Sequence, residues 1–442
     1  MKKNQELLET GTYPKLLLNL CLPSVIIMLV MVVYNMADTY FIGQTGDSAK
    51  VAALSLCSPV FSILSGLGTL FGSGGCTAIS LALGKKDYET VKSCSSLCFI
   101  CSLVIGFAML LVLTVGAEPI ARFLGADADT LSYTVSYLRI IGFGAPLISF
   151  SNIFCNIVRA DGAAVESMIA NLLGTIANIV LDAVFILGLS MDIPGAALAT
   201  VLGNLLSSLF LLRYLCNKQS AYSLHPKHLP NGIGKLPQIL SLGMPLACST
   251  ILMSVSNVIA NRMMMNYGSV ALAAQGVAGK AGSMISMLLM GICMGLQPAI
   301  SFNCGQGNKK RIGQILRNTA IFTVALGSLL SIGCFLLRNQ LITAFLDDPD
   351  VIAYGQVMVF ASILIGPFYG IYQLCQTFLQ STGKASYATI TALLDKGLFY
   401  LPILLLMEHF FGMYGIAFSS AVTLFFSILA GLYFSRRWSR RL

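Results

Sequence analysis

Two aspartates inside long apolar runs are the residues of this sequence best suited to chemistry. Asp182 lies within GTIANIVLDAVFILG, four residues after Asn178, and Asp38 lies within YNMADTYFIG. In a helix, the spacing of four places the Asn178 amide and the Asp182 carboxylate on one face. A carboxyl group shielded from water can hold a proton near neutral pH, because desolvation disfavours its charged form. With an amide carbonyl and a hydroxyl, the same oxygens can instead coordinate Na⁺.

Ionisable groups inside apolar spans are costly, and they are therefore candidates for function. An occupied and an empty acid site differ in charge, and this difference can bias two conformations of a protein. The alternative for Asp38 and Asp182 is structural, as a helix cap or as the partner of a neighbouring Arg. The Asp182 run contains no cation, whereas Asp38 lies nearer the end of its run.

Charged residues of the second half offer a second group of candidates. Adjacent residues of a helix point to different sides, so Asp395 and Lys396 are each expected to need a partner elsewhere. Lys280 and Arg262 are the proposed partners, either as structural ion pairs or inside a cavity. Methionines such as Met287 give a soft, adaptable apolar surface, although most such residues belong to a core or face lipid. The predicted substrate cavity comprises Tyr34, Asn35, Arg262, Lys280, Asp395 and Met287.

Motifs for nucleotide-driven or hydrolytic chemistry are absent from the sequence. No Gly-Lys pair is followed by Ser or Thr as a phosphate-binding loop requires, and neither G-x-S-x-G nor H-E-x-x-H occurs. We therefore predict that the chain is not an enzyme and that it needs no cofactor apart from a coupling ion, H⁺ or Na⁺.

The elements that position these residues are predicted to be membrane helices. Of 442 residues, 56% are hydrophobic and 10% are charged, and the mean hydropathy is +0.81. A soluble domain has about 25% charged residues, and a spanning helix needs about 20 apolar ones. The sequence thus predicts an all-α polytopic membrane protein with twelve transmembrane helices, near 14–42, 51–83, 90–115, 131–158, 165–189, 195–216, 238–266, 270–303, 312–337, 351–381, 385–407 and 413–434.

Basic residues are distributed unequally between alternate connections. Of the 27 Lys and Arg residues, 20 fall on one side of the predicted membrane or at span ends facing it, and three (Lys50, Arg122 and Arg338) fall on the other. The remaining four, Arg139, Arg262, Lys280 and Lys396, lie deep within spans. The positive-inside rule then places both termini in the cytoplasm. The net charge of +9 belongs to these short connections rather than to a basic domain, so no nucleic-acid partner is expected. The lipid bilayer is the expected surrounding, and we expect a monomer.

An internal repeat divides the chain into two similar halves. LCLPSVIIMLVMVVYN around Pro23 matches LGMPLACSTILMSVSN around Pro245, an offset of 222, and Gly195 matches Gly415 at 220. We predict an N-lobe at 1–216, a cytoplasmic linker at 217–237 and a C-lobe at 238–442. Because each lobe has an even number of spans, the two six-helix pseudo-symmetric lobes run in the same sense.

These motifs resemble the multidrug and toxic compound extrusion (MATE) transporters of the polysaccharide-lipid flippase superfamily. The resemblance rests on Pro23 to Gly43, R-A-D-G at 159–162, N-I-V-L-D at 178–182 and P-G-A-A-L-A-T at 194–200, and it covers nearly the whole chain. It implies a twelve-helix exporter of the bacterial inner membrane that antiports organic cationic or amphipathic compounds against H⁺ or Na⁺.

The resemblance also implies the position of the cation site. In the DinF-like branch, this site falls on Asp38, Asn178, Asp182 and Thr200 of the present sequence. The NorM-like branch uses an acid on the seventh span, where this chain has Arg262 instead. A lipid-linked precursor flippase of the same superfamily is the alternative function. It would need a strongly basic cavity, whereas few cations lie within the spans.

Overall fold

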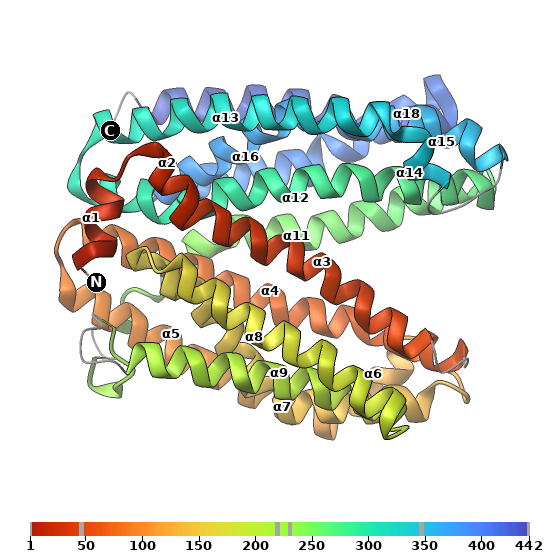
Figure 1. Ribbon diagram of the computed structural model, residues 1–442, viewed down its shortest axis with the longest axis horizontal. Helices are drawn as coiled ribbons and strands as arrows, with labels where there is room; N and C mark the ends of the chain where they lie inside the picture. Colours follow the sequence, from red (N-terminus) through yellow and green to blue (C-terminus); the bar gives the residue numbers. More distant parts are fainter. Residues whose placement is uncertain (1, 44–47, 217–221, 229–231, 344–348, 440–442) are drawn as a thin grey trace. The chain divides into compact units, whose positions relative to one another are not determined.

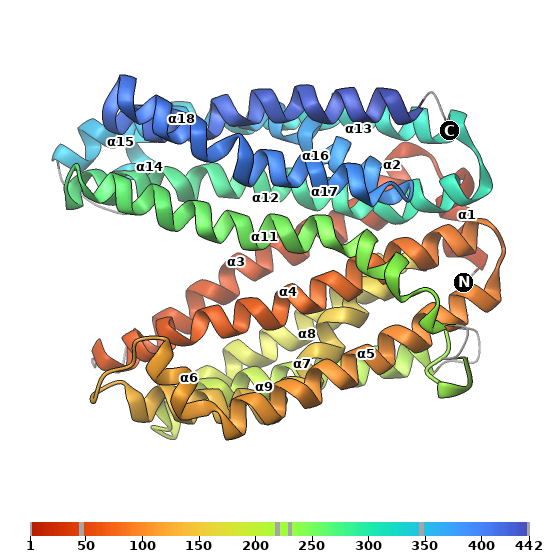
Figure 2. The same cartoon turned by 180° about the vertical axis from the view of Figure 1, so that it is seen from behind.

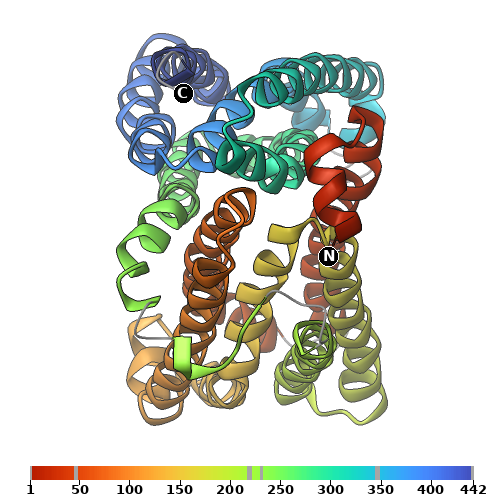
Figure 3. The ribbon, with the colours of Figure 1, turned by 90° about the vertical axis from the view of Figure 1, so that its left-hand side faces the viewer.

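The computed structural model describes residues 2–43, 48–216, 222–228, 232–343 and 349–439, and each regular element in these ranges is a helix (Figure 1). In this part of the chain, eleven helical stretches are long and apolar enough to cross a membrane. Figure 3 looks nearly along the helix axes and shows the helices gathered into bundles. The structure therefore agrees with a multi-pass, all-α membrane protein.

The count of eleven differs from the predicted twelve because the last stretch, Ala385–Ser439, has 55 residues and covers two predicted spans. A straight helix of this length would be about 80 Å long, against about 30 Å of hydrocarbon. Gly412 breaks it with φ 59° and ψ −138°. A Cβ on Gly415 would lie 1.8 Å from the Met407 carbonyl oxygen. Met407 precedes Gly412 and Gly415 follows it, so this close approach shows that the chain reverses at Gly412. Figure 2 shows the blue chain returning alongside itself, which gives two crossings.

Contacts divide the chain into two compact units: Met1–Thr10 with Ile26–Gly243, and Gly11–Val25 with Met244–Leu442. Helix α3 (Leu22–Gly43) therefore begins in the second unit and continues in the first, whereas α11 (Leu236–Met265) begins in the first and continues in the second. Both changes of unit occur beside the matched prolines, Pro23 and Pro245. The predicted borders at 216 and 238 stay a prediction, because this grouping follows contacts rather than the polarity of the linker.

The first unit is built around α7. This helix packs against α5, α4 and α9, and it buries residues such as Leu138, Ile141 and Ile148. A Cβ on Gly106 of α5 would lie 2.4 Å from Cα of Pro146, so a missing side chain lets α5 approach α7 closely. The elements are α1 (Lys2–Thr10), α4 (Ser48–Gly84), α5 (Tyr88–Val115), α6 (Ala117–Phe123), α7 (Leu131–Ile157), η2 (Val158–Asp161), α8 (Ala164–Asp182), η3 (Ala183–Gly188), α9 (Asp192–Leu215) and η4 (Pro226–His228).

The second unit is built around α12, which packs against α15, α16 and α13. The segment η1 also lies on α12, where a Cβ on Gly295 would come 2.6 Å from the Leu20 carbonyl oxygen. The Tyr13 hydroxyl of the preceding helix α2 donates to Oγ1 of Thr319 at 3.2 Å, which ties α2 to α13. The remaining elements are α2 (Tyr13–Leu16), η1 (Leu17–Cys21), α12 (Ser269–Gln306), α13 (Lys309–Leu336), α14 (Arg338–Thr343), α15 (Pro349–Ile363), α16 (Gly366–Ser381), α17 (Ala385–Leu393), η5 (Leu394–Leu398) and α18 (Tyr400–Ser439).

Candidate functional site

Three of the four residues of the predicted cation site meet in the interior of the first unit. Asn178 and Asp182 lie on α8 and Thr200 lies on α9, and each is at most 2% exposed. Nδ2 of Asn178 donates to Oγ1 of Thr200 at 3.3 Å, and this hydroxyl donates to the Ala196 carbonyl at 3.1 Å. The structure thus brings a carboxylate, an amide and a hydroxyl together at one place between two helices.

Two glycines allow α8 and α9 to come this close. A Cβ on Gly203 would lie 2.5 Å from the Gly174 carbonyl oxygen and 3.2 Å from Cβ of Asn178. Small residues at such crossings let helix backbones approach within a membrane. The glycine pair therefore sets the distance across which Asn178 reaches Thr200.

The backbone changes its winding directly after the acid. Helix α8 ends at Asp182, and the π-helical turn η3 begins at Ala183. Such turns often accompany functional sites because they re-aim the neighbouring side chains. Oδ1 of Asn178 has no hydrogen-bond partner among the described residues, so a carbonyl-type acceptor is available beside the carboxylate. Oxygen acceptors of this kind suit Na⁺, and the carboxylate suits a proton.

The predicted contribution of the first span falls outside the described side chains. Tyr34, Asn35 and Asp38 lie on α3, but the structure describes only their place along the helix. The part played by Asp38 in the cation site remains a prediction. So does the assignment of Tyr34 and Asn35 to the substrate cavity.

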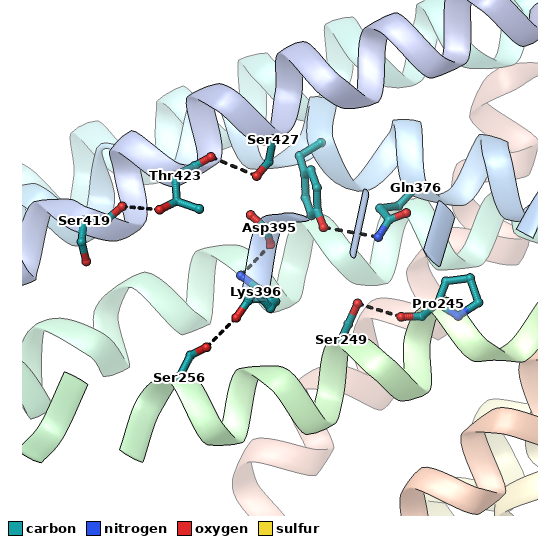
Figure 4. A network of polar contacts seen from close by, with 10 residues as sticks. Pro245, Ser249, Ser256, Gln376, Asp395, Lys396, Ser419, Thr423 and Ser427 are labelled. Carbon is teal, nitrogen blue, oxygen red and sulfur yellow. Dashed lines mark hydrogen bonds and ion pairs between the residues drawn. The ribbon is translucent and has the colours of Figure 1, made fainter. Parts of the chain in front are cut away.

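The charged residues of the second unit pair differently from the prediction. Asp395 is 2% exposed on η5, and its Oδ2 lies 2.9 Å from Nζ of Lys396 (Figure 4). The prediction that these neighbours need partners elsewhere, with Arg262 or Lys280 for the acid, was wrong. The pair lies in a π-helical turn, which has more residues per turn than an α-helix, so adjacent side chains diverge less. The long, flexible Lys stem then closes the remaining distance.

The other residues of the predicted substrate cavity are scattered over two helices. Arg262 is exposed on α11, Lys280 is exposed on α12, and Met287 is half-buried on α12. These exposures are compatible with a cavity wall and equally with an outer surface, so the cavity assignment remains a prediction.

Sequence reasoning missed a second buried acid of the first unit. Asp161 is 2% exposed and accepts a hydrogen bond from the Tyr214 hydroxyl at 3.1 Å and one from the Ala163 amide at 3.3 Å. The R-A-D-G motif is the sequence signal for this position. Both donors belong to the same unit, and Gly162 follows with φ 87°, so the acid fixes the turn between α7 and α8.

Comparison with known proteins identifies the family. The MatE family model matches residues 23–184 and again residues 245–406. The chain belongs to the MatE family. Both matches begin at the paired prolines and are offset by 222 residues, which confirms the internal repeat and the predicted resemblance.

Relatives with curated names align along almost the whole chain. The multidrug export protein MepA of Staphylococcus saprophyticus is 32% identical over 411 residues, covering 93% of this chain and 91% of the relative. The protein of the same name from Staphylococcus aureus strain MSSA476 is 32% identical over 405 residues, covering 92% of this chain and 89% of the relative.

Solved structures show the same fold. The crystal structure of MATE in complex with MaL6 has a TM-score of 0.92 at 21% identity, covering 100% of this chain and 99% of the other. The outward-facing conformation of a multidrug resistance MATE family transporter of the MOP superfamily also has a TM-score of 0.92 at 21% identity, covering 99% and 98%. The likeness confirms the predicted fold class.

Proposed function

We propose that the chain is a secondary active multidrug exporter, which antiports small organic cationic or amphipathic compounds against H⁺ or Na⁺. The observation that carries the proposal is the match along nine-tenths of the chain to relatives named multidrug export proteins. These names support export and do not support the alternative, a lipid-linked precursor flippase. They also favour a transporter over an enzyme.

The proposed coupling site is the cluster of Asn178, Asp182 and Thr200 in the first unit, with Asp38 as its expected fourth member. A proton neutralises the Asp182 carboxylate, whereas Na⁺ would be held by that carboxylate, the free Oδ1 of Asn178 and the Thr200 hydroxyl. In either case, the bound ion removes the cost of a buried negative charge. Two conformations that solvate the acid differently then bind the ion with different affinities, and this difference drives the transport cycle.

The proposed setting is the inner membrane of a bacterium, with both termini in the cytoplasm and the chain acting as a monomer. The excess of basic residues in alternate connections supports this orientation. The proposed substrate cavity keeps Tyr34, Asn35, Arg262, Lys280, Asp395 and Met287.

The test is ethidium efflux from proteoliposomes that contain the purified full-length protein, with Na⁺ and pH gradients imposed separately. We expect uphill efflux under one gradient, and we expect Asp182→Asn to reduce it at least tenfold because the variant cannot change charge. Asp129→Asn is the matched control, since it makes the same chemical change at an exposed position outside the spans. Wild-type efflux by Asp182→Asn would refute the coupling role, and the absence of gradient-driven efflux would refute the function.

A further inference from the structure

The pair of Asp395 and Lys396 lies at membrane depth, within the second unit. Asp395 is ten residues from the start of α17 at Ala385 and 17 residues from the reversal at Gly412. Ten residues of helix rise about 15 Å, which is half of the roughly 30 Å hydrocarbon core. Charged residues at this depth are costly, and they line a protein interior or a water-filled cavity rather than lipid.

The two charges differ in how far they reach the surface of the unit. The side chain of Asp395 is 3% exposed, whereas that of Lys396 is 30% exposed. The ammonium has three donors, and among the described residues its recorded ion pair is the one with Asp395. The acid is thus fixed in the interior, and its cation covers it from the more open side.

The backbone around the pair is held firmly. Oγ of Ser256 on α11 donates to the Lys396 carbonyl at 2.6 Å, and η5 packs against α18. Figure 4 shows this arrangement, in which Lys396 lies between Asp395 and Ser256. The Lys side chain can therefore leave the carboxylate while the acid keeps its position.

Two tyrosines, Tyr369 and Tyr372, lie near the acid, and an amide holds the second of them. The rings of Tyr369 and Tyr372 lie 6.2 Å apart, and both charges of the pair act on Tyr369. Nε2 of Gln376 donates to the Tyr372 hydroxyl at 3.3 Å, and Oε1 of Gln376 accepts from Thr391 at 2.8 Å. A carboxylate beside aromatic rings is the usual chemistry for recognising organic cations.

We propose that Asp395 is the anion of an organic-cation site in the second unit, and that the Lys396 ammonium occupies this site until a substrate cation displaces it. The proposal rests on the proposed export of organic cations and adds where one of them binds. The resting pair is neutral overall. A lipophilic monovalent cation takes the place of the ammonium at the carboxylate, while the ammonium moves toward water and keeps its charge.

The experiment measures equilibrium binding of radiolabelled tetraphenylphosphonium to the full-length protein in detergent, without any ion gradient. Lys396→Gln removes the internal competitor, and we expect its Kd to be at least fivefold lower than that of the wild type. Asp395→Asn combined with Lys396→Gln removes both charges, so no unpaired buried charge is left to unfold the protein. We expect this double variant to bind at least tenfold more weakly than Lys396→Gln and more weakly than the wild type.

Lys309→Gln and Asp129→Asn, both at exposed positions, are the matched controls and should bind as the wild type does. A monodisperse double variant with wild-type affinity would overturn the site, and so would a folded Lys396→Gln protein with no gain in affinity. If Lys396→Gln does not fold, the site is tested by comparing the tetraphenylphosphonium affinity of the double variant with that of the wild type. Wild-type protein that does not bind tetraphenylphosphonium would reject organic-cation export itself, and with it this site.

Discussion

Gly203→Ala tests whether the packing of α8 against α9 sets the geometry of the coupling site. The new Cβ would lie 2.5 Å from the Gly174 carbonyl oxygen, where an ordinary contact begins at 3.4 Å. The helices must therefore separate by about 0.9 Å at this crossing. If Asn178 follows α8, its distance to Thr200 grows from 3.3 Å to about 4.2 Å, which is beyond hydrogen-bonding range.

The expected cost is that of one neutral hydrogen bond, about 1 kcal/mol. This corresponds to a roughly fivefold loss of affinity for the coupling ion. The assay is ethidium efflux from proteoliposomes, measured as a function of coupling-ion concentration. We expect the half-maximal concentration to rise about fivefold in Gly203→Ala by the same conversion. Gly66→Ala is the control, because a Cβ there would have no atom within 4 Å.

An unchanged half-maximal concentration in a well-folded Gly203→Ala protein would refute the reasoning. It would mean that the contact of Asn178 with Thr200 does not hold the coupling ion, or that the helices absorb the extra carbon elsewhere. A crystal structure of the variant would separate these two readings, because only the second keeps the 3.3 Å contact.

Two further predictions concern stability. Gly412→Ala forces a Cβ into a backbone conformation with φ 59° and ψ −138°, so it should cost about 1–3 kcal/mol and lower the melting temperature, whereas Gly333→Ala, with no neighbour within 4 Å, should not. Asp87 caps α5 by accepting from the amide and hydroxyl of Thr90 at 3.0 and 2.6 Å, and these bonds lower its pKa below 3.8. Asp87→Ala should cost about 1 kcal/mol at pH 7. Because the folded pKa is depressed, this stabilisation is present above pH 3.8 and is lost as the pH falls through the folded value. A difference in melting temperature between wild type and variant that is the same at pH 7 and at pH 3 would contradict the prediction.

The sequence predicts the spans and the repeat well, because both depend on patterns that a bilayer enforces at every crossing. Asn178 and Asp182 were predictable as neighbours from their spacing of four. The prediction of Thr200 as a site residue, by contrast, came from the family resemblance, because no local sequence pattern connects this residue to α8. The structure places it 3.3 Å from Asn178.

One feature escaped prediction for a physical reason. The π-helical turn that lets Asp395 meet Lys396 has no recognised sequence signal, so the α-helical rule for adjacent residues gave the wrong partners. The reversal at Gly412, by contrast, falls between the predicted spans 385–407 and 413–434 and agrees with that boundary. Asp38 remains a prediction, since its side chain lies outside the described part of α3.

The change of unit near the start of α3 and of α11 bears on how such a chain can arise and fold. Residues Gly11–Val25 are encoded with the first half but complete the second, and the stretch before Met244 does the reverse. Neither half expressed as a separate polypeptide would contain its whole bundle. An ancestral single copy would have met this requirement by pairing with an identical copy, each contributing the start of its chain to the bundle of the other. Fusion of two gene copies would then have placed both exchanged segments within one polypeptide.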